Sequence, residues 1–113
     1  MLVDMHVGNE TLSEIFAIAE ADGMAETTGA ARRVGLECNV SEGAFCDILP
    51  PAASDAASVS LPKDLSMRLT RELDPKMIEH SKDGRMMLRC TDANGQRQCE
   101  VDRGSGWQEI SVR

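Results

Sequence analysis

The chain has 113 residues, a formal net charge of −7 and a pI near 4.7. An acidic surface repels the phosphates of nucleic acids and of anionic membranes, so generic binding to either is not expected. The length fits one domain over residues 1–113, and no apolar run approaches the roughly 18–20 residues that a membrane span needs.

A helix is predicted from Asn9 to Asp22, after an extended segment at residues 1–9. Thr11 and Glu14 have the spacing of a capping box, in which a hydroxyl and a carboxylate accept hydrogen bonds from free N–H groups of the first turn. The helix is expected to end at the glycine that follows Asp22. An apolar stripe with helical spacing marks its buried face, made of Leu12, Ile15, Phe16 and Ala19.

Residues 24–33 fit either a second short helix or an irregular turn, because alanines favour a helix and a Thr-Thr-Gly run interrupts one. Residues 34–49 predict a hairpin, since apolar and polar side chains alternate with the period of a strand. A three-residue loop at 41–43 would place Cys38 opposite Cys46. If the pair next to that loop is hydrogen-bonded, so is the cysteine pair, with Cα atoms about 5.5 Å apart, which still permits a disulfide.

Residues 50–58 are rich in proline, alanine and serine and predict a loop. A helix is expected from Ser60 to Leu73, with Ser60 as its N-cap and a proline in its first turn. Asp74 precedes a proline, which interrupts the helix, and a short helix is expected over residues 75–82. The longer helix has an apolar stripe of four leucines, Leu61, Leu65, Leu69 and Leu73.

The strongest local signal is the Asn94-Gly95 pair. Both central positions of a type I′ turn need positive φ, which asparagine and glycine tolerate best. The pair therefore predicts a hairpin with strands at 85–92 and 96–103. After a Gly-Ser-Gly turn, alternating residues predict a last strand at 107–112.

The Asn-Gly turn also fixes which side chains face each other. Asp92 faces Arg97, with opposite charges. Cys90 faces Cys99 at a non-hydrogen-bonded site, where Cα atoms lie about 4.5 Å apart and a disulfide can form. Because the other hairpin also brings two cysteines into register, we expect two disulfides, although four reduced structural cysteines are the alternative.

The order of elements predicts an α+β fold: a small domain with a largely antiparallel sheet, built from two hairpins plus a C-terminal strand, with helices on one face. Disulfides persist in oxidising compartments. The N-terminal residues lack the basic and apolar regions of a signal peptide. We therefore expect a periplasmic or secreted protein if a leader was removed, and a cytoplasmic protein otherwise.

Motifs for catalysis are absent from the sequence, which has no H-E-x-x-H, G-x-S-x-G, P-loop or G-x-G-x-x-G pattern. The cysteine pairs enclose seven and eight residues, unlike the short knuckles of structural zinc sites. His6 and His80 show no ligand spacing. We expect a protein that is not an enzyme and has no metal or cofactor. A thiol- or zinc-dependent protein is the alternative if the cysteines are reduced.

These observations predict a small acidic module that binds, and so inhibits, neutralises or escorts, a partner protein with a basic surface. Disulfides favour an exported inhibitor or immunity-type protein, and reduced cysteines favour a cytoplasmic chaperone or a phage anti-host factor. One candidate contact is Trp107, the only tryptophan, which could instead fill the core. The other is the acidic side of the first helix, which could simply be solvated: Glu10, Glu14, Glu20 and Asp22.

Overall fold

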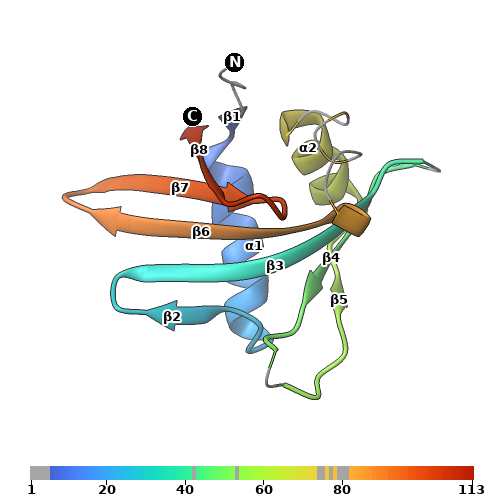
Figure 1. Ribbon diagram of the computed structural model, residues 1–113, viewed down its shortest axis with the longest axis horizontal. Helices are drawn as coiled ribbons and strands as arrows, with labels where there is room; N and C mark the ends of the chain where they lie inside the picture. Colours follow the sequence, from blue (N-terminus) through green and yellow to red (C-terminus); the bar gives the residue numbers. More distant parts are fainter. Residues whose placement is uncertain (1–5, 42, 53, 74–75, 77, 79–81) are drawn as a thin grey trace.

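Two helices lie against a twisted sheet of eight strands (Figure 1). The computed structural model describes residues 6–41, 43–52, 54–73, 76, 78 and 82–113. The elements in chain order are β1 (His6–Val7), α1 (Asn9–Ala21), β2 (Glu26–Thr28), β3 (Ala31–Asn39), β4 (Phe45–Leu49), β5 (Val59–Ser60), α2 (Lys63–Leu73), the 3₁₀ turn η1 (Lys82–Gly84), β6 (Arg85–Ala93), β7 (Gln96–Asp102) and β8 (Trp107–Val112).

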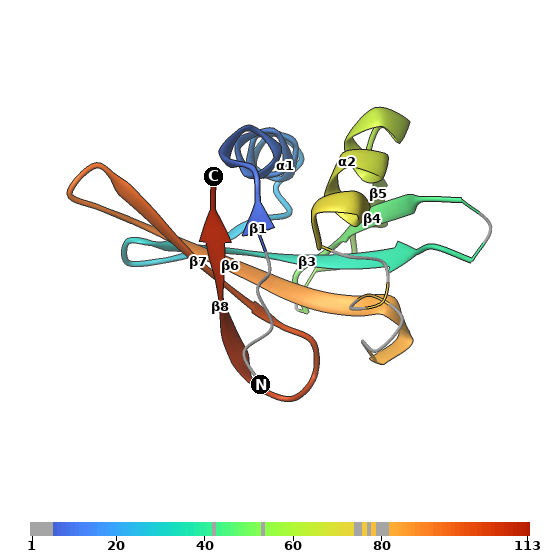
Figure 2. The ribbon, with the colours of Figure 1, turned by 90° about the horizontal axis from the view of Figure 1, so that it is seen from above.

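The strands follow the order β1-β8-β7-β6-β3-β4-β5, and β2 also pairs with β3. Among the described strands only β1 and β8 run parallel. The hairpins β3–β4 and β6–β7 join through β3 and β6, and Figure 2 shows both helices on the same side of these central strands. The predicted α+β fold is therefore confirmed, with its two hairpins, its C-terminal strand and its helices on one face.

Helix α1 forms where its apolar stripe predicts, and all four residues of that stripe are buried. The predicted capping box is wrong, because Thr11 is buried and Glu14 pairs with Arg68 of α2 at 2.6 Å between Oε2 and Nη1. The N-cap is Gly8, which has no capping side chain. Its N–H instead donates to Oε1 of Glu72 on α2, at 3.0 Å. A carboxylate from another helix thus accepts the hydrogen bond from the N-cap N–H, a role that the predicted capping box assigned to a carboxylate within α1 itself.

The segment after α1 is a strand, so both structures expected for residues 24–33 are wrong. The helix ends as predicted before Gly23, which has a φ of 68°. β2 then pairs with the start of β3 through a tight turn in which Gly29 has a φ of 62°. Two β-branched threonines favour this extended backbone over a helix.

The hairpin β3–β4 has the predicted register, with Cys38 opposite Cys46 and a disulfide between them. The hydrogen-bonded geometry considered for this pair is wrong. The N–H of Cys46 donates to Oγ of Ser66 at 3.2 Å, and its carbonyl accepts from the N–H of Leu61 at 2.9 Å. Both groups point away from β3, so the site is the closer, non-hydrogen-bonded kind, with Cα atoms 4.1 Å apart.

The difference arises in the loop, because β3 ends at Asn39 and β4 begins at Phe45. The Oδ1 atom of Asn39 accepts hydrogen bonds from the N–H of Ser41 at 2.9 Å and from its hydroxyl at 2.7 Å. Because of this local turn, the pairing of β3 with β4 ends at Asn39, one residue before the predicted three-residue loop would end it.

The hairpin β6–β7 is confirmed in turn, register and cross-link. Asn94 and Gly95 have φ values of 54° and 75°, as a type I′ turn requires. Cys90 faces Cys99 and forms the second disulfide, with Cα atoms 4.1 Å apart. All four cysteines are at most 4% exposed, and they lie on the helix-facing side of the sheet.

Helix α2 begins at Lys63, three residues later than predicted, because Ser60 belongs to β5. The carbonyl of Pro62 accepts from the N–H of Ser66 at 2.9 Å, so the first turn follows the proline instead of including it. The short helix predicted over residues 75–82 falls largely outside the described residues. The predicted leucine stripe is buried: Leu61, Leu65, Leu69 and Leu73.

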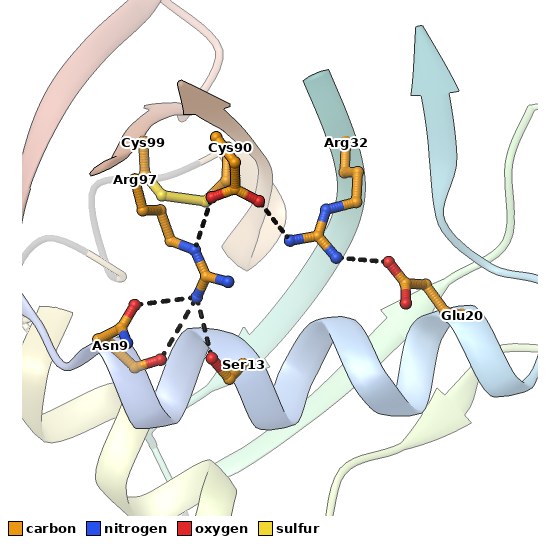
Figure 3. A network of polar contacts seen from close by, with 8 residues as sticks. Asn9, Ser13, Glu20, Arg32, Cys90, Arg97 and Cys99 are labelled. Atoms are coloured by element: carbon orange, nitrogen blue, oxygen red, sulfur yellow. Dashed lines mark hydrogen bonds and ion pairs between the residues drawn. A yellow bond between two sulfur atoms is a disulfide. The ribbon is translucent and has the colours of Figure 1, made fainter. Parts of the chain in front are cut away.

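A polar network fastens α1 to the end of the β6–β7 hairpin (Figure 3). Arg97 pairs with Asp92, as the register predicts, at 3.3 Å between Nε and Oδ1. Its Nη1 also donates to Oδ1 of Asn9 and Oγ of Ser13, each at 3.0 Å. Since these two residues lie in the first turns of α1, one arginine ties the helix to the strand.

Candidate interaction surface

The two faces of the sheet differ in what covers them. Side chains alternate along each strand, so Val34, Leu36 and Cys38 of β3 point toward the helices and are buried. In Figure 2 neither α1 nor α2 lies on the opposite side of the sheet. We call this second side, formed by the alternate residues of β4, β3, β6, β7 and β8, the open face.

A cross-strand row through the middle of the open face is mostly apolar. Leu49, Gly35, Met87, Asp102 and Trp107 are successive partners across β4, β3, β6, β7 and β8. A Cβ atom on Gly35 would lie 3.3 Å from Sδ of Met87 and 3.4 Å from Cβ of Leu49. The missing side chain of the glycine therefore leaves room for Leu49 and Met87, which flank it on the two neighbouring strands.

Shallow hollows lie on the two sides of Leu49 and Met87. One has a volume of about 470 Å³ and lies toward the β7–β8 turn. The other has a volume of about 320 Å³ and lies beside residues 50–52, which follow β4. Both hollows share Leu49 and Met87, so these side chains form a ridge between them. The larger hollow also contacts Arg85, Asp102 and Arg103, and the smaller one contacts Met24, Glu26 and Arg33.

Trp107 lies on the open face and is half-buried, outside the core. The guanidinium carbon of Arg89 is 4.0 Å from its ring centroid, a cation–π contact. Arg89 also pairs with Glu100, at 2.9 Å between Nη2 and Oε1. Glu109 faces Glu100 across the strands, yet among the described residues it has no cationic partner. The structure thus places the tryptophan at an accessible surface, next to a carboxylate that no described cation neutralises.

A similar group of one arginine and two carboxylates lies on the β3–β4 side of the open face. We call the β7–β8 side and the β3–β4 side its two flanks. Arg85 of β6 pairs with Glu37 of β3, at 2.8 Å between Nε and Oε2. Asp47 of β4 faces Glu37, and in the described part of the chain no cation pairs with it. Among the described residues, each flank therefore has one arginine, one carboxylate paired with it and one outer carboxylate without a cationic partner.

The acidic residues of α1 remain exposed, but two of them are already engaged. Glu14 pairs with an arginine of α2, and Glu20 pairs with Arg32 of β3, both at 2.6 Å between nitrogen and oxygen. The guanidinium of Arg32 also lies over the Phe16 ring, 4.9 Å from its centroid. These carboxylates hold α1 in place, which leaves Glu10 and Asp22 as its unengaged acidic side chains on the described surface.

Most of the open face was not identified from the sequence, which singled out only Trp107. A usable signal was present in β6, where Met87 interrupts a polar series between Arg85 and Arg89. An apolar residue on the otherwise polar face of a strand marks either a second core or a contact surface.

Replacing Trp107 by alanine is expected to lower the free energy of unfolding by about 1 kcal/mol, because the lost cation–π contact is partly exposed. For a chain of this size the melting temperature should fall by about 3–6 °C. The control is Phe16→Ala, since that ring is 1% exposed and its loss should cost about 3–5 kcal/mol. Equal losses in the two variants, measured by thermal denaturation, would show that Trp107 supports the core.

The cysteines have no free thiol in this structure, because all four form disulfides. The described residues contain no group of three or more His, Cys, Asp or Glu side chains that could hold a metal ion. None of the described helices is long and apolar enough to cross a membrane. Of the two histidines, His6 lies in β1 and His80 is outside the described residues.

The open face is therefore the surface on which a functional interpretation rests. It combines the apolar side chains of Leu49 and Met87, a half-buried tryptophan that Asp102 separates from them, and two outer carboxylates. A scan against protein-family models and searches of curated proteins and of solved structures found no match.

Proposed function

We propose that this chain is a small acidic protein-binding module that inhibits, neutralises or escorts a partner protein and has no catalytic activity of its own. The observation that carries the proposal is the apolar row of the open face, on the side of the sheet away from the helices. Sheets with an apolar face usually bury it against another layer. Tryptophan, methionine and arginine, which meet on this face, are the residues enriched in protein interfaces.

The scaffold suits this role because the strands that carry the open face are cross-linked. The Cys38–Cys46 bond joins β3 to β4, and the Cys90–Cys99 bond joins β6 to β7. A surface held rigid before binding loses less conformational entropy when a partner docks.

The oxidised cysteines favour the exported version of the proposal, in which the protein is a periplasmic or secreted inhibitor or immunity-type protein. A cytoplasmic chaperone or phage anti-host factor is the second candidate, and it requires reduced cysteines. A thiol- or zinc-dependent role requires reduced cysteines as well.

The partner is expected to have a basic surface. The chain has a net charge of −7, which attracts a cationic partner over long range and speeds encounter. On the open face the three arginines of β3 and β6 each pair with a carboxylate, whereas Asp47 and Glu109 have no such partner among the described residues. The face as a whole therefore remains acidic.

The proposal is tested by capture from an extract of the source organism with matched baits. Met87→Glu places a charge in the apolar row, and Met67→Glu makes the same change on α2, where the methionine is 48% exposed. The wild type and Met67→Glu should retain the same protein. Met87→Glu and Trp107→Ala should bind that purified protein at least about tenfold more weakly, as expected for loss of a central contact.

Melting temperatures of all four baits show whether each variant is folded. Retention of the same protein by every bait, with equal affinity, would exclude the open face as the contact surface. A wild-type bait that retains no protein would argue against the binding function itself. If the captured protein is an enzyme or a toxin, its activity should fall as the wild type is added up to equimolar amounts.

A further inference from the structure

The kind of element that can dock on the open face is limited by the backbone of the sheet. The central strands β3, β6 and β7 are paired along both edges over much of their length, so their N–H and C=O groups are used in the ladders. A partner strand adds at a free sheet edge, where it completes such a ladder, and not on a face. An element that docks on the face must therefore form its backbone hydrogen bonds within itself, as an α-helix does.

On the opposite face of the sheet, this chain itself provides helices that pack against the strands. There α1 and α2 bury apolar stripes against the sheet and leave their polar sides to solvent. A helix on the open face would complete a three-layer arrangement of helix, sheet and helix. Its apolar stripe would cover the Leu49–Met87 ridge and reach Trp107, and its side chains would enter the two hollows of about 470 and 320 Å³.

The charges of the open face specify the ends of that helix. Like charges that face each other across strands are destabilising unless a cation is near. Glu109 faces Glu100, and Asp47 faces Glu37, and in the described part of the chain the arginine of each flank pairs with the inner carboxylate. A cation from outside would relieve each pair. The partner element should therefore present one basic residue to each flank.

The spacing of the two flanks matches a helix of ordinary length. Asp47 and Glu109 are separated by four strand intervals and by four residues measured along β6. With strands about 4.8 Å apart and a rise of about 3.3 Å per residue, the diagonal is about 20–25 Å. At about 1.5 Å per residue, a helix of about 15 residues spans that distance.

We infer that the open face binds a basic amphipathic α-helix of the partner, which lies diagonally over the Leu49–Met87 ridge and pairs with Asp47 and Glu109 at its two ends. This inference rests on the proposed function and specifies the chemistry of the partner. The helix has leucine-like side chains on one stripe and lysine or arginine beside that stripe.

The probe is a synthetic leucine–lysine peptide of about 18 residues, with leucines at helical spacing. The wild type should bind it at an ionic strength of about 0.15 M, where long-range attraction is screened beyond about 8 Å. Amide signals of Gly35 and Met87 should shift in NMR spectra, and those of α1 should not. There are two control peptides. The first has the same composition with leucine and lysine alternating, a pattern that favours a strand. The second has glutamate in place of lysine.

The deciding comparison uses two double variants with the same change in net charge. Asp47→Asn with Glu109→Gln should weaken binding of the helical peptide by about threefold to tenfold, as expected for two exposed ion pairs. Glu10→Gln with Asp22→Asn removes two carboxylates from α1 and should leave the affinity unchanged. Calorimetry measures both, and melting temperatures confirm that the variants are folded.

Equal weakening by the two double variants would show attraction to general acidity and overturn the inference. Equal binding of the alternating peptide would overturn the helical part of it. If the captured natural partner depends on Met87 while the helical peptide does not bind, the helix inference fails and the proposed function stands. If the wild type binds neither the helical peptide nor any natural partner, both fail.

Discussion

Reduction of the two disulfides is expected to lower the free energy of unfolding by about 5 kcal/mol, because each bond removes about 2.5–3 kcal/mol of chain entropy from the unfolded state. The sequence separations are 8 residues for Cys38–Cys46 and 9 for Cys90–Cys99, so the two contributions should be nearly equal. Small domains have a total stability of about 5–15 kcal/mol. The reduced protein should therefore lie near the limit of folding.

The measurement is urea denaturation with and without a reductant, together with intact mass after alkylation in denaturant. No thiol should alkylate before reduction, and four should alkylate afterwards. The variants Cys38→Ala/Cys46→Ala and Cys90→Ala/Cys99→Ala separate the two bonds, and each should lose at least about half of the total because the alanines also leave small cavities.

Alkylation of all four cysteines without reductant would contradict the oxidised state. The exported inhibitor would then lose its support, and the cytoplasmic chaperone or phage factor would become the leading hypothesis. A protein that is oxidised but loses less than about 1 kcal/mol on reduction would show that the unfolded chain retains hairpin structure, so that the bonds constrain it little.

The features that the sequence predicts well are those decided by neighbours in the chain. The turn at Asn94 and Gly95 depends on two adjacent residues with positive φ, and it fixes the register as far as Cys90 and Cys99. The buried stripe of α1 depends only on helical spacing. Each signal lies within about ten residues, so no tertiary information is needed.

The features that it misses depend on contacts between distant segments. The N–H of the N-cap residue of α1, Gly8, donates to Glu72 of α2, more than sixty residues away, and no local pattern indicates this contact. The threonines of β2 form a strand because β3 is there to pair with them. In both places a tertiary partner outweighs a local preference for helix or cap.

The open face could not be predicted from the sequence either, because it too depends on contacts between distant segments. Leu49 and Met87 flank Gly35 only because β3 lies between β4 and β6, and Arg89 reaches Trp107 only because β7 lies between β6 and β8. Periodicity shows which residues share a face of one strand, but it does not show which strands are neighbours. The tryptophan could therefore be identified from the sequence, whereas the surface around it could not.

The change Gly84→Ala is expected to destabilise the protein by about 2–5 kcal/mol, through two additive causes. Gly84 has a φ of 71°, a left-handed conformation that costs an alanine about 1–2 kcal/mol. A Cβ atom there would also overlap the carbonyl oxygen of Cys38, a backbone atom next to a disulfide. Since that strand is held by β4 and β6, it cannot move aside without loss of ladder hydrogen bonds.

The matched control is Gly95→Ala, because Gly95 has nearly the same φ, 75°, but a Cβ atom on it would have no neighbouring atom within 4 Å. It should lose only the conformational part, about 1–2 kcal/mol. Urea denaturation of both variants gives the two losses, and equal slopes with denaturant show that the unfolded states are comparable. The excess loss in Gly84→Ala measures how tightly η1 is packed against β3. Equal losses would mean that η1 can withdraw from that strand, so that its position at the end of the open face is not fixed by the fold.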